Sequence, residues 1–417
     1  MIQRFRKKTY DFLRWGEKYT KTDNVYLAKG GFWLTFGQVI STFSSFGLAV
    51  AFANLLPPAT YGIYQFVLAT AGILSATTLS GLNRAAIRSV ARGAEGVILE
   101  SLKIKIRWGS LGSLTSLILA GYYFFQSNLT LSISFLVVSF FLPLFFSLGI
   151  SSSLLKGKKE FGADAKYGAF NQIAAVVVML LALIFSDNIF LILTSYFGIW
   201  TLLRFLIFKI TLRKYQTNQN LDPEIKSYGK HLSVMGFIGT IADYLDKLLI
   251  FHFFGAIEVA FYSFAISPVI QLNGLLKNVH SLALPKLSIK SKTEIQKTIT
   301  GKSLSLLLFS IPLFIFYILS APFIYKIFFP NYIDSVFFSQ IFALTIPLVA
   351  FGTLSATALE AQMEVKRKYI LTLFSKISKI ILMIVLVIPY GILGIIFGTI
   401  INYILVVVLA FFLAIKK

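Results

Sequence analysis

Residues 392–414 read ILGIIFGTIINYILVVVLAFFLA and are followed closely by two basic residues, Lys416 and Lys417. None of the residues in this stretch carries a charge. A helix needs about 20 mostly apolar residues to cross a bilayer, whereas a barrel strand needs only about 10 that alternate in polarity. Backbone groups in lipid must also be bonded internally. The stretch therefore predicts a membrane-spanning helix with a basic end.

The rest of the chain repeats this pattern. The predicted spans are the twelve apolar runs at approximately 31–54, 62–83, 108–126, 130–154, 167–186, 188–208, 231–254, 259–283, 303–325, 335–359, 369–388 and 392–414. Of the 417 residues, 57% are hydrophobic and 13% are charged. Soluble proteins carry roughly 25% charged residues. A soluble enzyme and a disordered protein are therefore excluded.

The segments between the predicted spans are of two alternating kinds. One kind is short and nearly free of cations, with Lys326 as its single lysine, whereas the other kind is basic. The positive-inside rule assigns basic segments to the cytoplasm. We therefore expect a multi-pass protein of a bacterial cytoplasmic membrane with both termini cytoplasmic, which requires an even number of spans. The net charge of +22 then reflects topology, and no nucleic-acid partner is expected.

The longest basic loop divides the predicted spans into two sets of six. We expect a basic segment at the inner membrane surface (1–29), an N-terminal six-helix bundle (30–208), a cytoplasmic linker (209–230) and a C-terminal six-helix bundle (231–417). With an offset of 198, LLPPATYGIYQFVLA at 55–69 lies over FFGAIEVAFYSFAIS at 253–267. Six spans separate the copies, so the repeat is parallel. Such pseudo-twofold repeats are typical of alternating-access transporters with a site between the halves.

One hairpin in this repeat also carries a family resemblance. Residues 54–64, NLLPPATYGIY, resemble the first external hairpin of the polysaccharide (O-antigen type, Wzx-like) flippases of the multidrug/oligosaccharidyl-lipid/polysaccharide (MOP) exporter superfamily, although Asn54 and Pro57 depart from the usual Arg and Gly. Shorter stretches at 81–91, 246–263 and 284–288 are similar to other family signatures.

The resemblance has clear implications for fold and function. It implies an all-α membrane protein, with twelve transmembrane helices in two pseudo-twofold-related six-helix bundles around a central cavity. It also implies flipping of an undecaprenyl-pyrophosphate-linked oligosaccharide, such as an O-antigen unit, from the inner to the outer leaflet. The expected partners are this polyprenyl-pyrophosphate-linked glycan, membrane lipids and other membrane proteins of polysaccharide assembly.

Three charged residues lie deep inside the predicted span 231–254, namely Asp243, Asp246 and Lys247. A charge at the bilayer centre costs from ~3 to more than ~10 kcal/mol. The three positions share one helical face, and Asp243 and Lys247 are four residues apart. This face could line a cavity in which Lys247 meets substrate and a carboxylate binds a coupling proton or Na⁺. The alternative is a buried pair that only fixes packing, but one lysine cannot fully neutralise two aspartates.

Other polar residues cluster near the inner ends of the second and eighth predicted spans. The candidate substrate-binding residues there are Arg84, Arg88, Lys277, Asn83 and Asn273. Cationic side chains suit a pyrophosphate and amides suit sugar hydroxyls, but the cations equally satisfy topology and the amides could bond neighbouring helices. Lys376 and Lys379 in the eleventh span are interpreted as snorkelling or as a cation beside a lipid groove.

Several kinds of site have no residues to support them. The chain has no Cys, its three His are scattered, and it lacks a Walker A sequence. We therefore expect no metal site, no cofactor and no enzymatic activity. Two alternatives to a flippase remain. A cation-coupled multidrug antiporter of the same superfamily is disfavoured by the basic inner mouth, and a membrane-embedded glycan polymerase or ligase is disfavoured by the small external loops.

Overall fold

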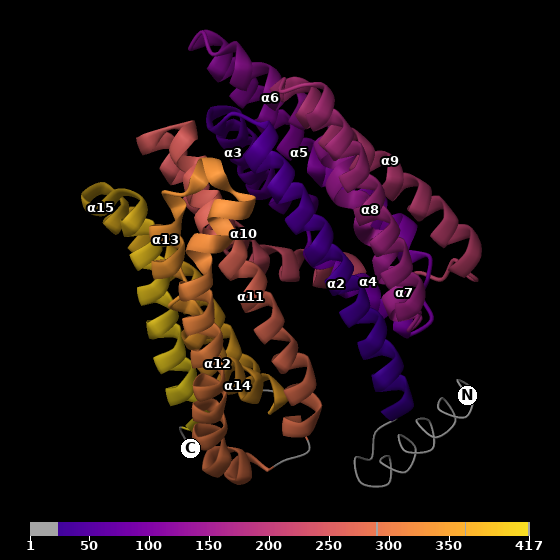
Figure 1. The fold of residues 1–417 in the computed structure, drawn as a ribbon. Coiled ribbons are helices and arrows are strands. Elements are labelled where there is room, and N and C mark those ends of the chain that lie inside the picture. The colour runs from indigo at the N-terminus through magenta and orange to yellow at the C-terminus, as the bar shows by residue number, and fades with distance from the viewer. Residues whose placement is uncertain (1–23, 289–290, 363, 416–417) are drawn as a thin grey trace, which may run out of the picture.

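The computed structural model describes residues 24–288, 291–362 and 364–415, and within these ranges the regular secondary structure is helical (Figure 1). Residues 1–23, most of the predicted surface segment, lie outside the described residues. The first half of the chain forms α2 (Asn24–Leu55), α3 (Pro58–Leu74), η1 (Ser75–Thr78), α4 (Gly81–Ala91), α5 (Val97–Phe125), α6 (Leu129–Ser147), η2 (Leu148–Ile150), α7 (Ser151–Gly157), α8 (Phe161–Phe185) and α9 (Ile189–Tyr215).

The second half is also helical and contains one very long element. It forms α10 (Ile225–Phe254), α11 (Ala256–Ser288), α12 (Lys292–Phe328), η3 (Pro330–Tyr332), α13 (Ser335–Phe342), α14 (Thr345–Ala361) and α15 (Val365–Ile415). Within α15, Gly391 has the non-helical dihedrals φ 59° and ψ −133°. This residue separates the last two predicted apolar runs, which lie on either side of it.

Each predicted apolar run falls on one helix or on consecutive helices. Among the described residues, nine helices are long and apolar enough to cross a membrane, and α15 counts once although it carries two predicted runs. The chain is therefore a multi-pass membrane protein, and the number of twelve crossings stays a prediction. The run at 62–83 is not one continuous helix, because η1 and the left-handed residue Leu79 (φ 54°) separate α3 from α4.

The two halves pack largely within themselves and meet along a limited contact. Figure 1 shows α2 to α9 on one side and α11 to α15 on the other, joined near α3 and α10 and spreading apart toward the start of α2. The main contacts between the halves join α3 with α10 and α11, and α4 with α10. At the joined end, one apolar core includes residues of both halves, such as Phe52, Tyr61, Phe264 and Tyr332.

Candidate functional site

A cavity of about 720 Å³ lies between the two halves of the chain. Its walls come from the start of α4, the middle of α10, the end of α14 and the start of α15. Small and apolar side chains form part of this lining, which includes Gly81, Leu232, Gly236 and Leu373. The cavity therefore lies on the spreading side of the contact between the halves, where a ligand would touch helices of both.

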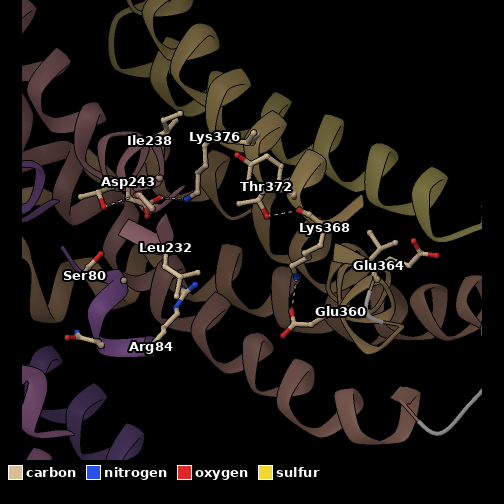
Figure 2. Close-up of a pocket in the computed structure, with 18 residues that line it drawn as sticks. Ser80, Arg84, Leu232, Ile238, Asp243, Glu360, Glu364, Lys368, Thr372 and Lys376 are labelled. Atoms are coloured by element: carbon tan, nitrogen blue, oxygen red, sulfur yellow. Dashed lines mark hydrogen bonds and ion pairs between the residues drawn. The ribbon is translucent and has the colours of Figure 1, made fainter. Parts of the chain in front are cut away.

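The cavity lining carries cations and carboxylates in equal number. On α15, Lys376 lies 2.6 Å from Asp243 of α10, and Lys368 lies 2.8 Å from Glu360 of α14 (Figure 2). The third cation, Arg84 on α4, points toward the cavity beside Leu232 and forms no ion pair within the part of the chain that the structure describes. The third carboxylate, Glu364, pairs with Arg367 at 3.6 Å.

The ion pairs of the cavity are partly open to it. The side chains of Asp243 and Lys376 are 55% and 29% exposed, and those of Glu360 and Lys368 are 43% and 36% exposed. Partly hydrated pairs of this kind contribute little to stability, about 0–1 kcal/mol, because water screens them. Such pairs can open at small cost, which is what a site needs if an anion is to replace one of the partners.

The three intramembrane charges of α10 were expected to line the cavity on one helical face, but each has its own partners and only Asp243 is in the lining. Asp243 lines the cavity, but Asp246 is only 6% exposed and accepts hydrogen bonds from the Tyr262 hydroxyl and the Lys247 backbone, both at 2.8 Å. The Lys247 ammonium donates to Gln65 of α3 at 2.6 Å. Successive helical residues point about 100° apart, so Asp246 and Lys247 face different neighbours.

The remaining predicted site residues are not all in the cavity. Asn83 lines it beside Arg84. Arg88 lies outside the lining, and its guanidinium stands 4.8 Å from the ring centre of Tyr228. A helical turn separates Arg88 from Arg84, yet only Arg84 turns toward the space between the halves.

Asn273 is buried, and its amide donates to the Thr345 hydroxyl at 3.0 Å. This bond joins α11 to α14 and matches the packing interpretation of that residue. The side chain of Lys277 lies outside the described residues.

Sequence reasoning missed the partners of these charges. The sequence leaves Lys376 between snorkelling and a cation beside a lipid groove, and it does not mark Glu360 or Lys368 as site residues. A usable signal existed for Lys376, because it stands inside an apolar run, where a charge is costly unless it has a partner. Gln65 carries no comparable signal, since a neutral amide is tolerated in many positions. Among the described residues, no cluster of three or more His, Asp or Glu side chains is placed to hold a metal ion.

Comparisons with known proteins agree with this architecture. The sequence model of a family described as "Polysaccharide biosynthesis protein" matches residues 27–288. A relative from Shigella flexneri, described as a "putative O-antigen transporter", is 22% identical over 394 residues, which are 88% of this chain and 93% of that protein.

Two solved structures are similar along nearly the whole chain. The lipid II flippase MurJ, in an inward closed conformation, aligns with a TM-score of 0.72 and 17% identity over 94% of this chain and 88% of that one. An inward-facing multidrug resistance MATE family transporter of the MOP superfamily aligns with a TM-score of 0.63 and 13% identity over 90% and 93%. At such identities the structures show the fold, and these relatives are transport proteins, not enzymes.

Proposed function

The chain belongs to the polysaccharide biosynthesis protein family, and on this premise we propose that it flips a polyprenyl-pyrophosphate-linked oligosaccharide across the cytoplasmic membrane. The family match agrees with the resemblance stated from the sequence. The substrate class is inferred from relatives whose names describe O-antigen transport and lipid II flipping. The charged cavity between the halves is the single observation that carries the proposal to particular residues.

Alternating access is the mechanism that this geometry supports best. The halves are joined by aromatic packing at the end with the predicted external hairpins, and the cavity lies on the other side of that contact. A lipid headgroup would enter from the cytoplasmic leaflet and meet Arg84, Lys368 and Lys376. Rocking of the halves would then seal the entrance and open the opposite end. A pyrophosphate carries several negative oxygens, which cationic side chains bind well.

The other predicted site residues take more limited roles in this proposal. Asn83 stands beside Arg84 and would bond sugar hydroxyls. Asp243 is the carboxylate that a coupling proton or Na⁺ reaches from the cavity, whereas Asp246 is reached only if Tyr262 moves away. Lys247 would contact substrate only after it leaves Gln65, so its first role is to hold the halves together.

Deletion of the gene in its native bacterium tests the proposal. We expect loss of the surface polysaccharide and accumulation of its lipid-linked precursor on the cytoplasmic side. Arg84→Ala should fail to restore the polysaccharide at normal protein levels, because the cavity loses its unpaired cation. Lys103→Ala is the matched control, since Lys103 is an exposed cation of α5 that does not line the cavity.

Different outcomes would point to the alternatives. Intact surface polysaccharide in the deletion strain, together with sensitivity to cationic drugs, would show that the chain is a multidrug antiporter and not a flippase. Precursor that reaches the outer face but stays unpolymerised would show that the chain is a glycan polymerase or ligase. Glycan labelling on inside-out and right-side-out vesicles separates both outcomes from the expected one, because it shows on which face of the membrane the precursor lies.

A further inference from the structure

The two lysines that α15 presents to the cavity are each neutralised by a carboxylate from another helix. Lys376 is paired with Asp243 at 2.6 Å, and Lys368 is paired with Glu360 at 2.8 Å. Neither pair is buried, since every one of the four side chains is between 29% and 55% exposed. In this conformation the lysines face the cavity, but each is already neutralised by its carboxylate partner.

Each of these carboxylates interacts with a second basic side chain. Glu360 lies 3.4 Å from the Nε2 atom of His280 on α11. Lys379 stands three residues beyond Lys376 and has no hydrogen bond or ion pair in the described part of the chain, and its ammonium group interacts electrostatically with Asp246 and with Asp243. If Lys376 or Lys368 turned to another anion, the carboxylate left behind would still have a partner. This arrangement keeps both carboxylates near a positive charge throughout the exchange.

We propose that Asp243 and Glu360 are exchangeable counterions, which a diphosphate headgroup displaces from Lys376 and Lys368. Arg84, the cavity cation without an ion pair in the described chain, attracts the diphosphate first. Its oxygens then take over the lysine ammonium groups, while Asp243 turns to Lys379 and Glu360 turns to His280. Release reverses the exchange, so the empty cavity is not left with unpaired cations that would trap the ligand. This inference rests on the proposed function, because it names the part of the substrate that the cavity binds.

The exchange makes an unusual prediction for the two members of one ion pair. Lys376→Gln removes a ligand of the diphosphate, and binding should weaken about tenfold, the typical effect of one charge-assisted hydrogen bond. Asp243→Asn removes the competitor, so binding should tighten about threefold. If the pair were purely structural, both variants would shift binding in the same direction, or neither variant would shift it. The second pair gives an independent copy of the test, with Lys368→Gln expected to weaken binding and Glu360→Gln to tighten it.

Binding is measured with the full chain in nanodiscs of zwitterionic lipid, and the probe is undecaprenyl pyrophosphate. Inorganic pyrophosphate is added in a competition arm, because displacement of the lipid by it would show that the headgroup alone drives the exchange. The matched control is the pair of Lys226 on α10 and Glu100 on α5, which lie 2.9 Å apart outside the cavity lining. Lys226→Gln and Glu100→Gln should leave binding unchanged.

The proposal is overturned if the lysine and carboxylate variants of both pairs change binding with the same sign, or leave it unchanged. Thermal unfolding of each variant identifies misfolded proteins, and Lys376→Arg, which keeps the charge, should bind within about threefold of the native chain. Same-sign results combined with precursor accumulation in the deletion strain would refute the exchange and leave the flippase standing. Absence of any lipid binding by the native chain would refute both.

Discussion

Glu95 shows how one buried side chain fixes the linker between the halves. It lies in the turn between α4 and α5, is 4% exposed, and its Oε1 is 2.7 Å from the Lys158 ammonium. Its carboxylate also accepts hydrogen bonds from the backbone of Thr217 and Asn218 in the linker. The linker is thus bound to the N-terminal half by a charged contact and is not a free tether.

This contact makes folding stability dependent on pH. Burial alone would raise the pKa of Glu95, but the hydrogen bonds from Lys158 and Thr217 outweigh it and hold the pKa below its usual range. The stabilisation is therefore full above the pKa of the unfolded chain, near 4.5, and is lost as the pH falls through the lower folded pKa. We expect Glu95→Gln to cost about 1–3 kcal/mol at neutral pH, because Lys158 loses its charged partner.

Thermal unfolding in detergent from pH 7 down to pH 3, measured by tryptophan fluorescence, checks this expectation. The difference in Tm between the native chain and Glu95→Gln should shrink toward acid pH. Glu224→Gln, an exposed carboxyl in the same linker, should match the native chain at every pH. A constant Tm difference across the range would contradict the assigned cause.

At the scale of single elements, Gly391 allows the last two predicted spans to fold back on each other. Its φ of 59° with ψ −133° is strained for any residue that carries a Cβ. We expect Gly391→Ala to destabilise the chain by about 1–3 kcal/mol. Packing is not the cause, since the added Cβ would meet only the Phe254 ring at an ordinary 3.5 Å.

A second glycine provides the control with the opposite sign. Gly301 lies inside α12, is exposed, and an added Cβ would meet nothing within 4 Å. Gly301→Ala should therefore keep or raise Tm, because alanine stabilises a helix by up to about 1 kcal/mol relative to glycine. Equal losses of Tm in the two variants would show that the backbone conformation of Gly391 is not what matters.

The elements also show what hydropathy predicts and what it does not. The run at 188–208 lies on α9, because a mostly apolar run of 21 residues in lipid has hardly any option but a helix. The break at Leu79 leaves no such signal, since the residues on both sides remain apolar or small. Asp243 was predictable as a site residue because a membrane carboxylate is costly. The same argument indicates that Lys376 needs a partner, but not that the partner is Asp243, since the periodicity of one helix does not reveal which distant helix it faces.

At the scale of the whole molecule, the halves are held together by reciprocal contacts at the joined end. The Asn54 amide donates to the Phe328 carbonyl, and the Asn331 amide donates to the Ala53 carbonyl, both at 3.0 Å. Closer to the cavity, Lys247 of α10 bonds Gln65 of α3. The proposed alternating access would require all these bonds to break together, so they would set how strongly this conformation is favoured.

At Gly62 on α3 the backbones of the two halves come very close together. A Cβ added there would lie 1.7 Å from the Ala256 carbonyl oxygen of α11, so the two helices would have to separate. We expect Gly62→Ala to move the conformational equilibrium away from the joined state. Spin labels at Leu55→Cys and Ile333→Cys report the distance between the two halves at the joined end. Both sites are exposed, and the chain has no native Cys.

The native chain should give a short label distance, and Gly62→Ala should add a longer population that grows at the expense of the short one. Gly168→Ala on α8, where the added Cβ meets nothing within 4 Å, should keep the native distribution. If flipping depends on reclosing this end, Gly62→Ala should also slow the appearance of surface polysaccharide while Gly168→Ala does not. A folded Gly62→Ala protein with the native distance distribution would mean that α3 and α11 can adjust at this point without separating. The joined end would then be held by the amide contacts of Asn54 and Asn331 alone.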